Sequence, residues 1–143
     1  MKSIGIINGP NLNLLGRRQP EIYGSTSFED YFIELRKVFP TTILHYYQSN
    51  HEGDLIDKLH EWGFELDGII LNAGGYTHTS IALRDAVSSI ETPVVEVHIS
   101  DISNREEFRK YSFIEDVALE SIIGKGLNGY DLGIKRILAI DPS

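Results

Sequence analysis

The chain has 143 residues, 41% of them hydrophobic, and no low-complexity tract, which is typical of one globular domain with its own core. It contains no cysteine, which excludes disulfides, thiolate nucleophiles, iron–sulfur clusters and cysteine zinc sites. Its formal net charge of −8 argues against broad nucleic-acid binding, which needs a basic face, but allows a small anionic ligand held by local cations.

Membrane and secretion signals are not evident in the sequence. No apolar run approaches the roughly 20 residues that a membrane helix needs. Residues 1–8 lack the charged start, long apolar stretch and small-residue cleavage site of a secretory signal. We therefore expect a soluble, cytoplasmic protein with no membrane partner and a single domain over residues 1–143.

Short apolar runs alternate along the chain with segments whose apolar residues recur at helical spacing. The first run, Ser3–Asn8, is rich in β-branched residues and predicts a buried strand. Further strands are predicted at residues 42–47, 68–71, 93–98 and 121–123. Helices are predicted at residues 27–39, 49–62, 80–89 and 130–138, with a short helical turn at 104–110.

Capping and breaker residues set the expected helix boundaries. The helix starts are predicted from the pairs Thr26/Glu29 and Ser49/Glu52, and the helix ends from Pro40 and Gly63. In the helix at 80–89 we expect Ile81, Ala82 and Val87 to contact the core.

Strands that alternate with helices predict an α/β fold with a parallel sheet covered on both faces. Because crossovers between parallel strands are right-handed, the leading candidate is a flavodoxin-like, doubly wound, five-stranded sheet in three layers. Ligands of such folds bind beyond the carboxyl ends of the strands, so these ends are where a site is expected.

Polar residues follow three of the predicted strands, in turns marked by glycine or proline. These residues are Asn8 to Asn11 after the first strand, Asn72 to His78 after the third, and Glu96, His98 and Ser100 at the end of the fourth. Amides in the glycine-rich turn before Ile81 could hold a carboxylate or phosphate. The alternative is a plain strand-to-helix turn capped by Thr79 or Ser80.

Two further features suggest acid–base chemistry. Glu96 and His98 are two residues apart on a strand and share a face, where the carboxylate fixes the imidazole tautomer and favours the protonated form. A structural histidine is the alternative. The long segment 17–24 places two arginines before Tyr23, and guanidinium groups lower the pKa of a phenol. A loop whose tyrosine only packs is equally compatible with that segment.

Three long motifs make the sequence resemble the type II 3-dehydroquinate dehydratases. The first runs from Asn8 to Gly24, the second from Leu71 to Ser80, and the third comprises 96–100, 105–109 and Ser112. Their order and spacing agree with the family over essentially the whole chain, which is far more specific than a lone glycine-rich loop.

The resemblance implies a flavodoxin-like single catalytic domain that dehydrates 3-dehydroquinate reversibly, with no metal and no cofactor. Tyr23 is implied as the base at carbon 2, Arg18 as the group that holds it as phenolate, and Asn11 as a holder of the water that stabilises the enolate. His98 is implied as the acid that protonates the departing hydroxyl, assisted by Glu96, in an anti elimination.

The family pattern also implies the binding residues and the assembly. The implied substrate-binding residues are Asn72, Gly74, His78, the amide of Ile99, Ser100 and Arg109, with Asp85 reaching the site of a neighbouring subunit. The implied assembly is a homododecamer, a tetramer of trimers, with a small anionic substrate and no nucleic-acid partner. Two departures, Asp101 and Lys125, fall outside the expected chemistry but could alter subunit contacts or loop shape.

Three alternatives stay open at the level of sequence. One is a non-enzymatic flavodoxin-like module, although Asn8 and Asn11 stand where a phosphoacceptor receiver needs acidic residues. The second is an imine-forming dehydratase, which needs a buried lysine, whereas the lysines fall at exposed, terminal or non-motif positions. The third is a binding protein on the same scaffold that has lost activity.

Overall fold

The structure is a computed structural model that describes residues 1–17, 21 and 24–141. Its strands are β1 (Ser3–Asn8), β2 (Ile43–Gln48), β3 (Gly68–Asn72), β4 (Val94–His98) and β5 (Glu120–Ile123). Its α-helices are α2 (Phe28–Val38), α3 (Glu52–Trp62), α4 (Ile81–Ser89) and α5 (Asn128–Leu138). Short 3-10 segments are η1 (Leu12–Leu14), η2 (Gly74–His78), η3 (Ile102–Asn104), η4 (Glu107–Arg109) and η5 (Glu115–Val117).

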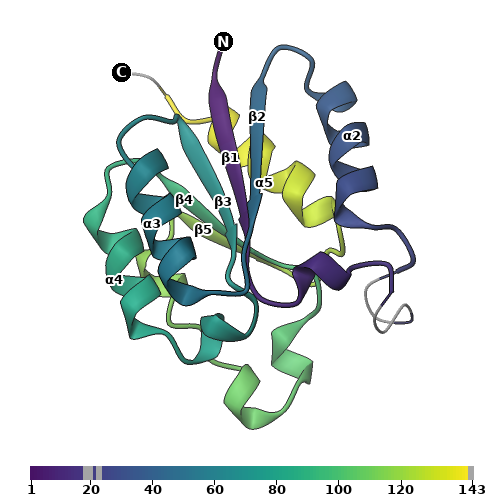
Figure 1. The fold of residues 1–143 in the computed structure, drawn as a ribbon, viewed down its shortest axis with the longest axis vertical. Coiled ribbons are helices and arrows are strands. Elements are labelled where there is room, and N and C mark those ends of the chain that lie inside the picture. Colours follow the sequence, from purple (N-terminus) through teal and green to yellow (C-terminus); the bar gives the residue numbers. More distant parts are fainter. Residues whose placement is uncertain (18–20, 22–23, 142–143) are drawn as a thin grey trace.

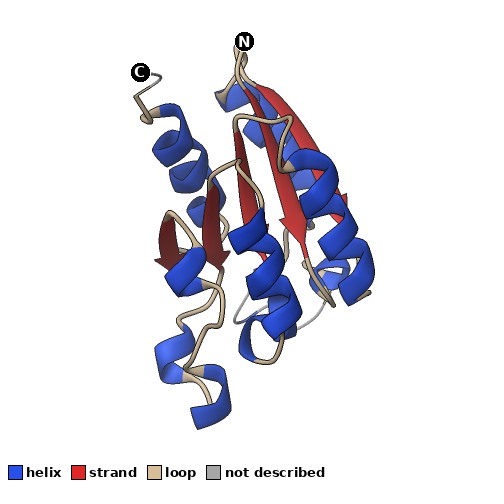
Figure 2. Ribbon diagram, turned by 90° about the vertical axis from the view of Figure 1, so that its left-hand side faces the viewer, coloured by secondary structure: helices blue, strands red, loops and turns tan. Residues whose placement is uncertain are grey.

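Within the described residues the strands form one five-stranded sheet in the order β2-β1-β3-β4-β5, and every neighbouring pair is parallel. Helices α3 and α4 cover one face of this sheet and α5 the other, with α2 beside β2 (Figure 1). The edge-on view in Figure 2 shows the sheet between these helices. The predicted flavodoxin-like fold in three layers is confirmed, because this strand order and the all-parallel sheet are its defining features.

The alternation of strand side chains divides the interior into two hydrophobic clusters. Ile6 and Ile70 lie in the cluster with Tyr130 of α5, whereas Ile7 and Val94 lie in the cluster with α3 and α4. Since side chains two apart share a face, the strand-end residues Asn8 and Asn72 point toward α5, and Glu96 and His98 point toward the opposite layer. The alternation of side chains along the strands therefore also determines on which face of the sheet each of these polar residues lies.

Helix starts differ in detail from the predicted capping pairs. Ser27, not Thr26, caps α2 by accepting the amide hydrogen of Asp30 at 3.1 Å. Helix α3 begins at Glu52 after His51, without a side-chain cap. The Ser49 hydroxyl instead accepts from the amide of His51 and donates to Asp54.

The predicted stop at Gly63 is confirmed, although its φ of −69° is not the left-handed conformation expected of a glycine cap. A Cβ at this position would lie 2.5 Å from the carbonyl oxygen of Leu59 and 2.4 Å from a side-chain carbon of Ile90. Close packing between α3 and the end of α4 is thus the reason for glycine.

Ser80 caps α4 through the amide of Leu83, as one of the alternatives anticipated. The predicted core contacts of Ile81 and Ala82 are wrong, since both are exposed, while Val87 is buried as predicted. The buried stripe is Leu83, Ala86 and Val87, which are spaced i, i+3 and i+4, so Ile81 and Ala82 lie off the face that packs on the sheet. The single turn predicted at 104–110 is two short segments, η3 and η4.

In the part of the chain that the structure describes, no helix has the length and apolar character required to cross a membrane.

Candidate active site

A pocket of about 200 Å³ opens at the carboxyl edge of the sheet, where the order of strands reverses between β1 and β3. The loops that follow β1, β3 and β4 supply its lining, and they lie at the lower end of the molecule in Figure 1. Its lining residues are Pro10, Asn11, Leu12, Leu14, Leu15, Asn72, Gly74, Gly75, His78, His98, Ile99, Ser100, Ile102, Arg105 and Arg109.

The pocket brings together most of the candidate residues named from sequence. Those that line it are Asn11, Asn72, Gly74, His78, His98, Ile99, Ser100 and Arg109. Glu96 lies behind His98, and Asp85 is exposed on α4 and does not line this chain's pocket. Arg18 and Tyr23 lie outside the described residues.

Glu96 and His98 form a buried pair at the end of β4. The Nε2 atom of His98 lies 2.7 Å from Oε2 of Glu96, and the residues are 5% and 1% exposed. The shared face predicted from their spacing is therefore confirmed. Because an ionised carboxylate only accepts, Nε2 carries a hydrogen, and Nδ1 is the ring nitrogen that this pairing leaves for a ligand.

Two serines complete the environment of the Glu96 carboxylate. Ser112 donates to Oε2 and Ser121 donates to Oε1, each at 2.5 Å. Ser112 also accepts the amide hydrogens of Ile114 and Glu115, which fixes its own hydroxyl hydrogen on Glu96.

Burial acts to raise the pKa of Glu96, but this effect is outweighed. The hydrogen bond and charge of His98, followed by the hydrogen bonds of Ser112 and Ser121, hold that pKa below its ordinary value of 4.5. The carboxylate is consequently ionised at neutral pH and provides a negative charge beside the His98 ring.

His78 presents a neutral imidazole to the same pocket. Burial is the main cause that lowers the pKa of His78 from 6.5, and the charges of His98, Arg109 and Arg105 add to the decrease. The hydrogen bond to the Tyr111 carbonyl opposes it. In the neutral ring Nδ1–H donates to that carbonyl at 2.8 Å, so Nε2 is an acceptor for a ligand hydroxyl.

Two arginines supply positive charge at the pocket wall. Arg105 donates from Nη1 to the Ser100 hydroxyl at 3.2 Å. Nε of Arg109 lies 2.8 Å from a carboxylate oxygen of Glu106, an ion pair without hydrogen-bond alignment. An anionic group is well matched to this wall despite the acidic chain.

The loops after β1 and β3 meet in close contact. A Cβ at Gly9 would lie 2.5 Å from the Ala73 carbonyl oxygen, and Gly74, at φ 61°, lies against Pro10. The amide hydrogen of Gly74 is accepted by Oδ1 of Asn72 at 3.2 Å. Asn11 adopts a left-handed conformation, with φ 70°, at the entrance to η1, where its side chain makes no capping hydrogen bond.

The two departures from the family pattern lie side by side behind the β4 loop. Asp101 caps η3 by accepting from the amide and hydroxyl of Ser103, which lowers the pKa of Asp101. Its Cβ lies 3.2 Å from the position that a Cβ of Gly124 would occupy. Lys125 follows in a turn whose flanking amides donate to the carbonyls of His98 and Ile99. These residues thus shape the loop that carries Ile99 and Ser100.

Three contributors were not assigned from sequence. Arg105 falls within the third sequence motif without an implied role, although its proximity to Arg109 in the sequence is a usable signal. Ser112 belongs to the same motif, also without an implied role. Ser121 had no signal, because its contact with Glu96 depends on the pairing of β4 with β5.

The arrangement suits acid–base chemistry on a small anion. The buried Glu96–His98 pair can act as a general acid when the ring is protonated, because Nδ1 is the ring nitrogen that is not paired with Glu96. The neutral His78 and the two arginines offer an acceptor and positive charge in the same pocket.

Comparisons with known proteins point to one family. The family model described as "Dehydroquinase class II" matches residues 2–138. The chain is 52% identical over 134 residues to the 3-dehydroquinate dehydratase of an Exiguobacterium strain, covering 93% of this chain and 92% of that protein. It is 48% identical over 140 residues to the 3-dehydroquinate dehydratase of Prochlorococcus marinus strain MIT 9301, with coverage of 96% and 95%.

Solved structures give the same result. The type II dehydroquinase of Butyrivibrio crossotus superposes with a TM-score of 0.91 at 44% identity, covering 96% of this chain and 98% of that one. The type II dehydroquinase of Propionibacterium acnes has a TM-score of 0.91 at 33% identity, with 98% of each chain covered.

Proposed function

This chain belongs to the class II dehydroquinases, and we propose that its pocket removes water from 3-dehydroquinate to form 3-dehydroshikimate in the shikimate pathway. The observation that carries the proposal is the buried Glu96–His98 pair, which faces the same pocket as two arginines and a neutral His78. Residues 1–143 are proposed to act as one catalytic domain.

The first half of the proposed reaction breaks a carbon–hydrogen bond. Tyr23, as phenolate beside Arg18, takes the proton from carbon 2, and the electron pair moves into the ketone to form an enolate. These two roles rest on the sequence motif. Asn11, which lines the pocket, holds a water that donates to the enolate oxygen.

The second half breaks a carbon–oxygen bond. The enolate electrons form the new carbon–carbon double bond as the hydroxyl leaves carbon 1, on the face opposite the lost hydrogen. His98 gives its Nδ1 proton to this hydroxyl, which departs as water, while Glu96 keeps the ring oriented through Nε2. The base and the acid thus have opposite protonation states at one pH.

Substrate binding is assigned to the rest of the lining. The carboxylate is proposed to lie near Ser100, the amide of Ile99 and Arg109, with Arg105 next to Ser100. Nε2 of His78 accepts from a substrate hydroxyl, and Asn72 and Gly74 complete the wall beneath it.

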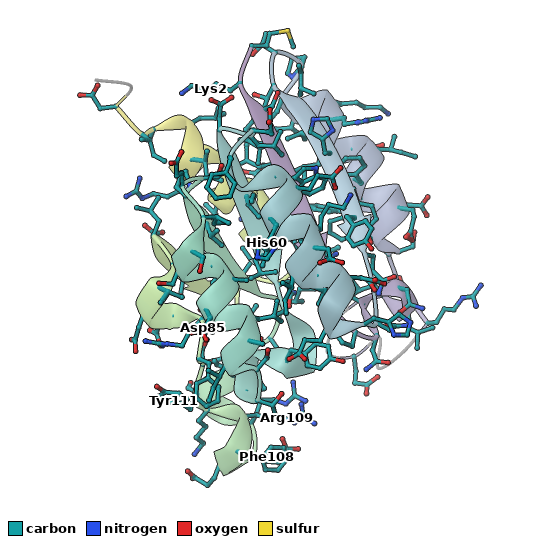
Figure 3. All side chains as sticks on the ribbon, turned by 60° about the vertical axis from the view of Figure 1, so that its left-hand side comes forward. Lys2, His60, Asp85, Phe108, Arg109 and Tyr111 are labelled. Atoms are coloured by element: carbon teal, nitrogen blue, oxygen red, sulfur yellow. The ribbon has the colours of Figure 1, made fainter. Side chains whose placement is uncertain are left out.

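Asp85 is proposed to serve the pocket of a neighbouring subunit in a homododecamer, a tetramer of trimers. It is exposed on the outer side of α4, and Phe108 and Tyr111 project at the surface below it (Figure 3). Exposure of 66% and 55% for these two aromatic rings favours burial by another copy of the chain.

The decisive assay follows the conjugated enone product by its ultraviolet absorbance, with purified protein and 3-dehydroquinate. We expect turnover by the natural sequence and none by Tyr23→Phe, which loses the proton acceptor but keeps the ring. Absence of turnover by the natural sequence contradicts the proposed activity, and near-normal turnover by Tyr23→Phe contradicts the assigned base. A borohydride-trapped adduct indicates the imine mechanism instead.

A further inference from the structure

A line of buried hydrogen bonds connects helix α5 to the pocket wall. The hydroxyl of Tyr130, which is fully buried in the first turn of α5, donates to Oδ1 of Asn8 at 2.8 Å. The hydroxyl oxygen of Tyr130 in turn accepts from Nδ2 of Asn72 at 3.0 Å. Asn8 and Asn72 are the last residues of β1 and β3 and lie opposite each other in the sheet. The tyrosine thus bridges the two strands at the switch point.

The direction of each bond in this line follows from what each atom can donate. Oδ1 of Asn8 only accepts, so the single hydrogen of Tyr130 goes to it. The Tyr130 oxygen must then accept from Asn72, which places Nδ2 toward α5. At the other end of the amide, Oδ1 of Asn72 accepts from the amide of Gly74 at 3.2 Å. Both ends of the Asn72 amide are therefore fixed.

The hydroxyl of Tyr130 keeps its hydrogen under all ordinary conditions. Burial is the main cause that raises the pKa of Tyr130 far above its ordinary value of 10.0. No change of pH in an enzyme assay reverses the polarity of this line.

We infer that Tyr130 is a positioning residue that makes Asn72 face the pocket as a hydrogen-bond donor rather than an acceptor. Asn72 lines the pocket, and the second hydrogen on Nδ2 is the one that Tyr130 does not use. The pocket then selects an accepting group at this point, such as a carboxylate oxygen or the lone pair of a hydroxyl. The inference rests on the proposed function for the identity of the ligand.

Tyr130→Phe tests this role, with Tyr46→Phe as its matched control. Both rings pack on Phe28, at centroid distances of 4.9 and 4.6 Å. Tyr46 has a buried hydroxyl with no well-aligned hydrogen bond in the described chain, and its proximity to Asn8 only partly offsets the burial that raises its pKa to about 12. Among the described residues, no hydrogen bond joins Tyr46 to Asn72.

The expected result for Tyr130→Phe is a rise of about five- to tenfold in KM and in the dissociation constant of 3-dehydroshikimate, measured by calorimetry. The pH profile of kcat stays in place, because Glu96 and His98 lie on the other face of the sheet. Tyr46→Phe keeps KM within about twofold of the natural sequence. In an Asn72→Ala background, Tyr130→Phe adds no further loss of affinity.

The inference is overturned if Tyr130→Phe lowers affinity equally in the natural sequence and in the Asn72→Ala background. It is also overturned if Tyr46→Phe raises KM as much as Tyr130→Phe does. A measurement on the natural sequence covers the case in which Tyr130→Phe does not fold. In the free protein, proton–nitrogen spectra should show one slowly exchanging and one rapidly exchanging Nδ2 hydrogen on Asn72. Two rapidly exchanging hydrogens refute the line of bonds. This spectrum and the binding of 3-dehydroshikimate need no turnover, so failure of the proposed activity is a separate outcome.

Discussion

Ser121 lies directly opposite Glu96 in the parallel pairing of β4 with β5, and its hydroxyl donates to Oε1 of that buried carboxylate. His98 and Ser112 share the other oxygen, Oε2. Among the described residues, Ser121 is thus the only side chain that provides Oε1 with a hydrogen-bond donor. A residue of the outermost strand thereby influences the protonation of a group at the pocket.

Replacement of Ser121 should move the acid limb of activity. Valine and threonine have nearly the same shape, but only threonine keeps the hydroxyl. Ser121→Val leaves Oε1 without a donor and raises the pKa of Glu96. Because the ionised form is lost as pH falls through that pKa, the fall in kcat at acidic pH should begin about one unit higher.

The measurement is kcat between acidic and neutral pH for Ser121→Val, Ser121→Thr and the natural sequence. Ser121→Thr should keep its acid limb within a few tenths of a unit of the natural one. Coincident profiles for valine and threonine contradict a role of the hydroxyl in setting the pKa of Glu96.

Glu96→Gln should reduce kcat by about a hundredfold at neutral pH, since the protonated His98 loses its counter-charge and its fixed ring orientation. KM should change little, because Glu96 lies behind His98 rather than in the lining. The control is Glu120→Gln on the adjacent strand, which only breaks an exposed ion pair with Arg136. Steady-state kinetics on both variants test this prediction. A near-natural kcat for Glu96→Gln rules out a role of Glu96 in assisting His98 as the acid.

The sequence was sufficient to predict what depends on short-range periodicity. The parallel sheet follows from alternating strands and helices, and the shared face of Glu96 and His98 follows from their two-residue spacing. Contacts that depend on packing could not be predicted in this way. Tyr130 reaches Asn8 across 122 positions, and no local pattern marks that pairing. The prediction for Ile81 was wrong because its apolar character alone does not show which face of the helix packs on the sheet, and Leu83, Ala86 and Val87 form that face.

His78 should remain neutral well below its ordinary pKa of 6.5, and Arg109→Gln should raise its pKa, because one of the positive charges that oppose its protonation is removed. Since the folded state binds that proton less readily than the unfolded chain, this group's contribution to stability is present above pH 6.5 and is lost as pH falls through the folded value. Proton NMR titration gives the pKa of His78 in the natural sequence and in Arg109→Gln. The His78 ring signals are assigned by their loss in His78→Gln.

Arg84→Gln is the control for the titration of His78, since its guanidinium pairs with Asp116 and is not a cause of the shift. A His78 pKa that is unchanged by Arg109→Gln, or lowered by it, is inconsistent with the charged wall described for this pocket.

Turnover measurements on Asp85 variants test whether this residue acts in the pocket of a neighbouring subunit. Asp85→Ala should lower turnover although Asp85 is absent from the lining of its own pocket, because the carboxylate is proposed to complete a neighbour's site. Co-expression of Asp85→Ala with His98→Asn should give mixed assemblies that are more active than either variant alone, since some pockets then combine an intact His98 with an intact Asp85. Asp57→Ala, an exposed change on α3, should not affect turnover. If mixed assemblies isolated by two affinity tags show no gain in activity, Asp85 does not act between subunits.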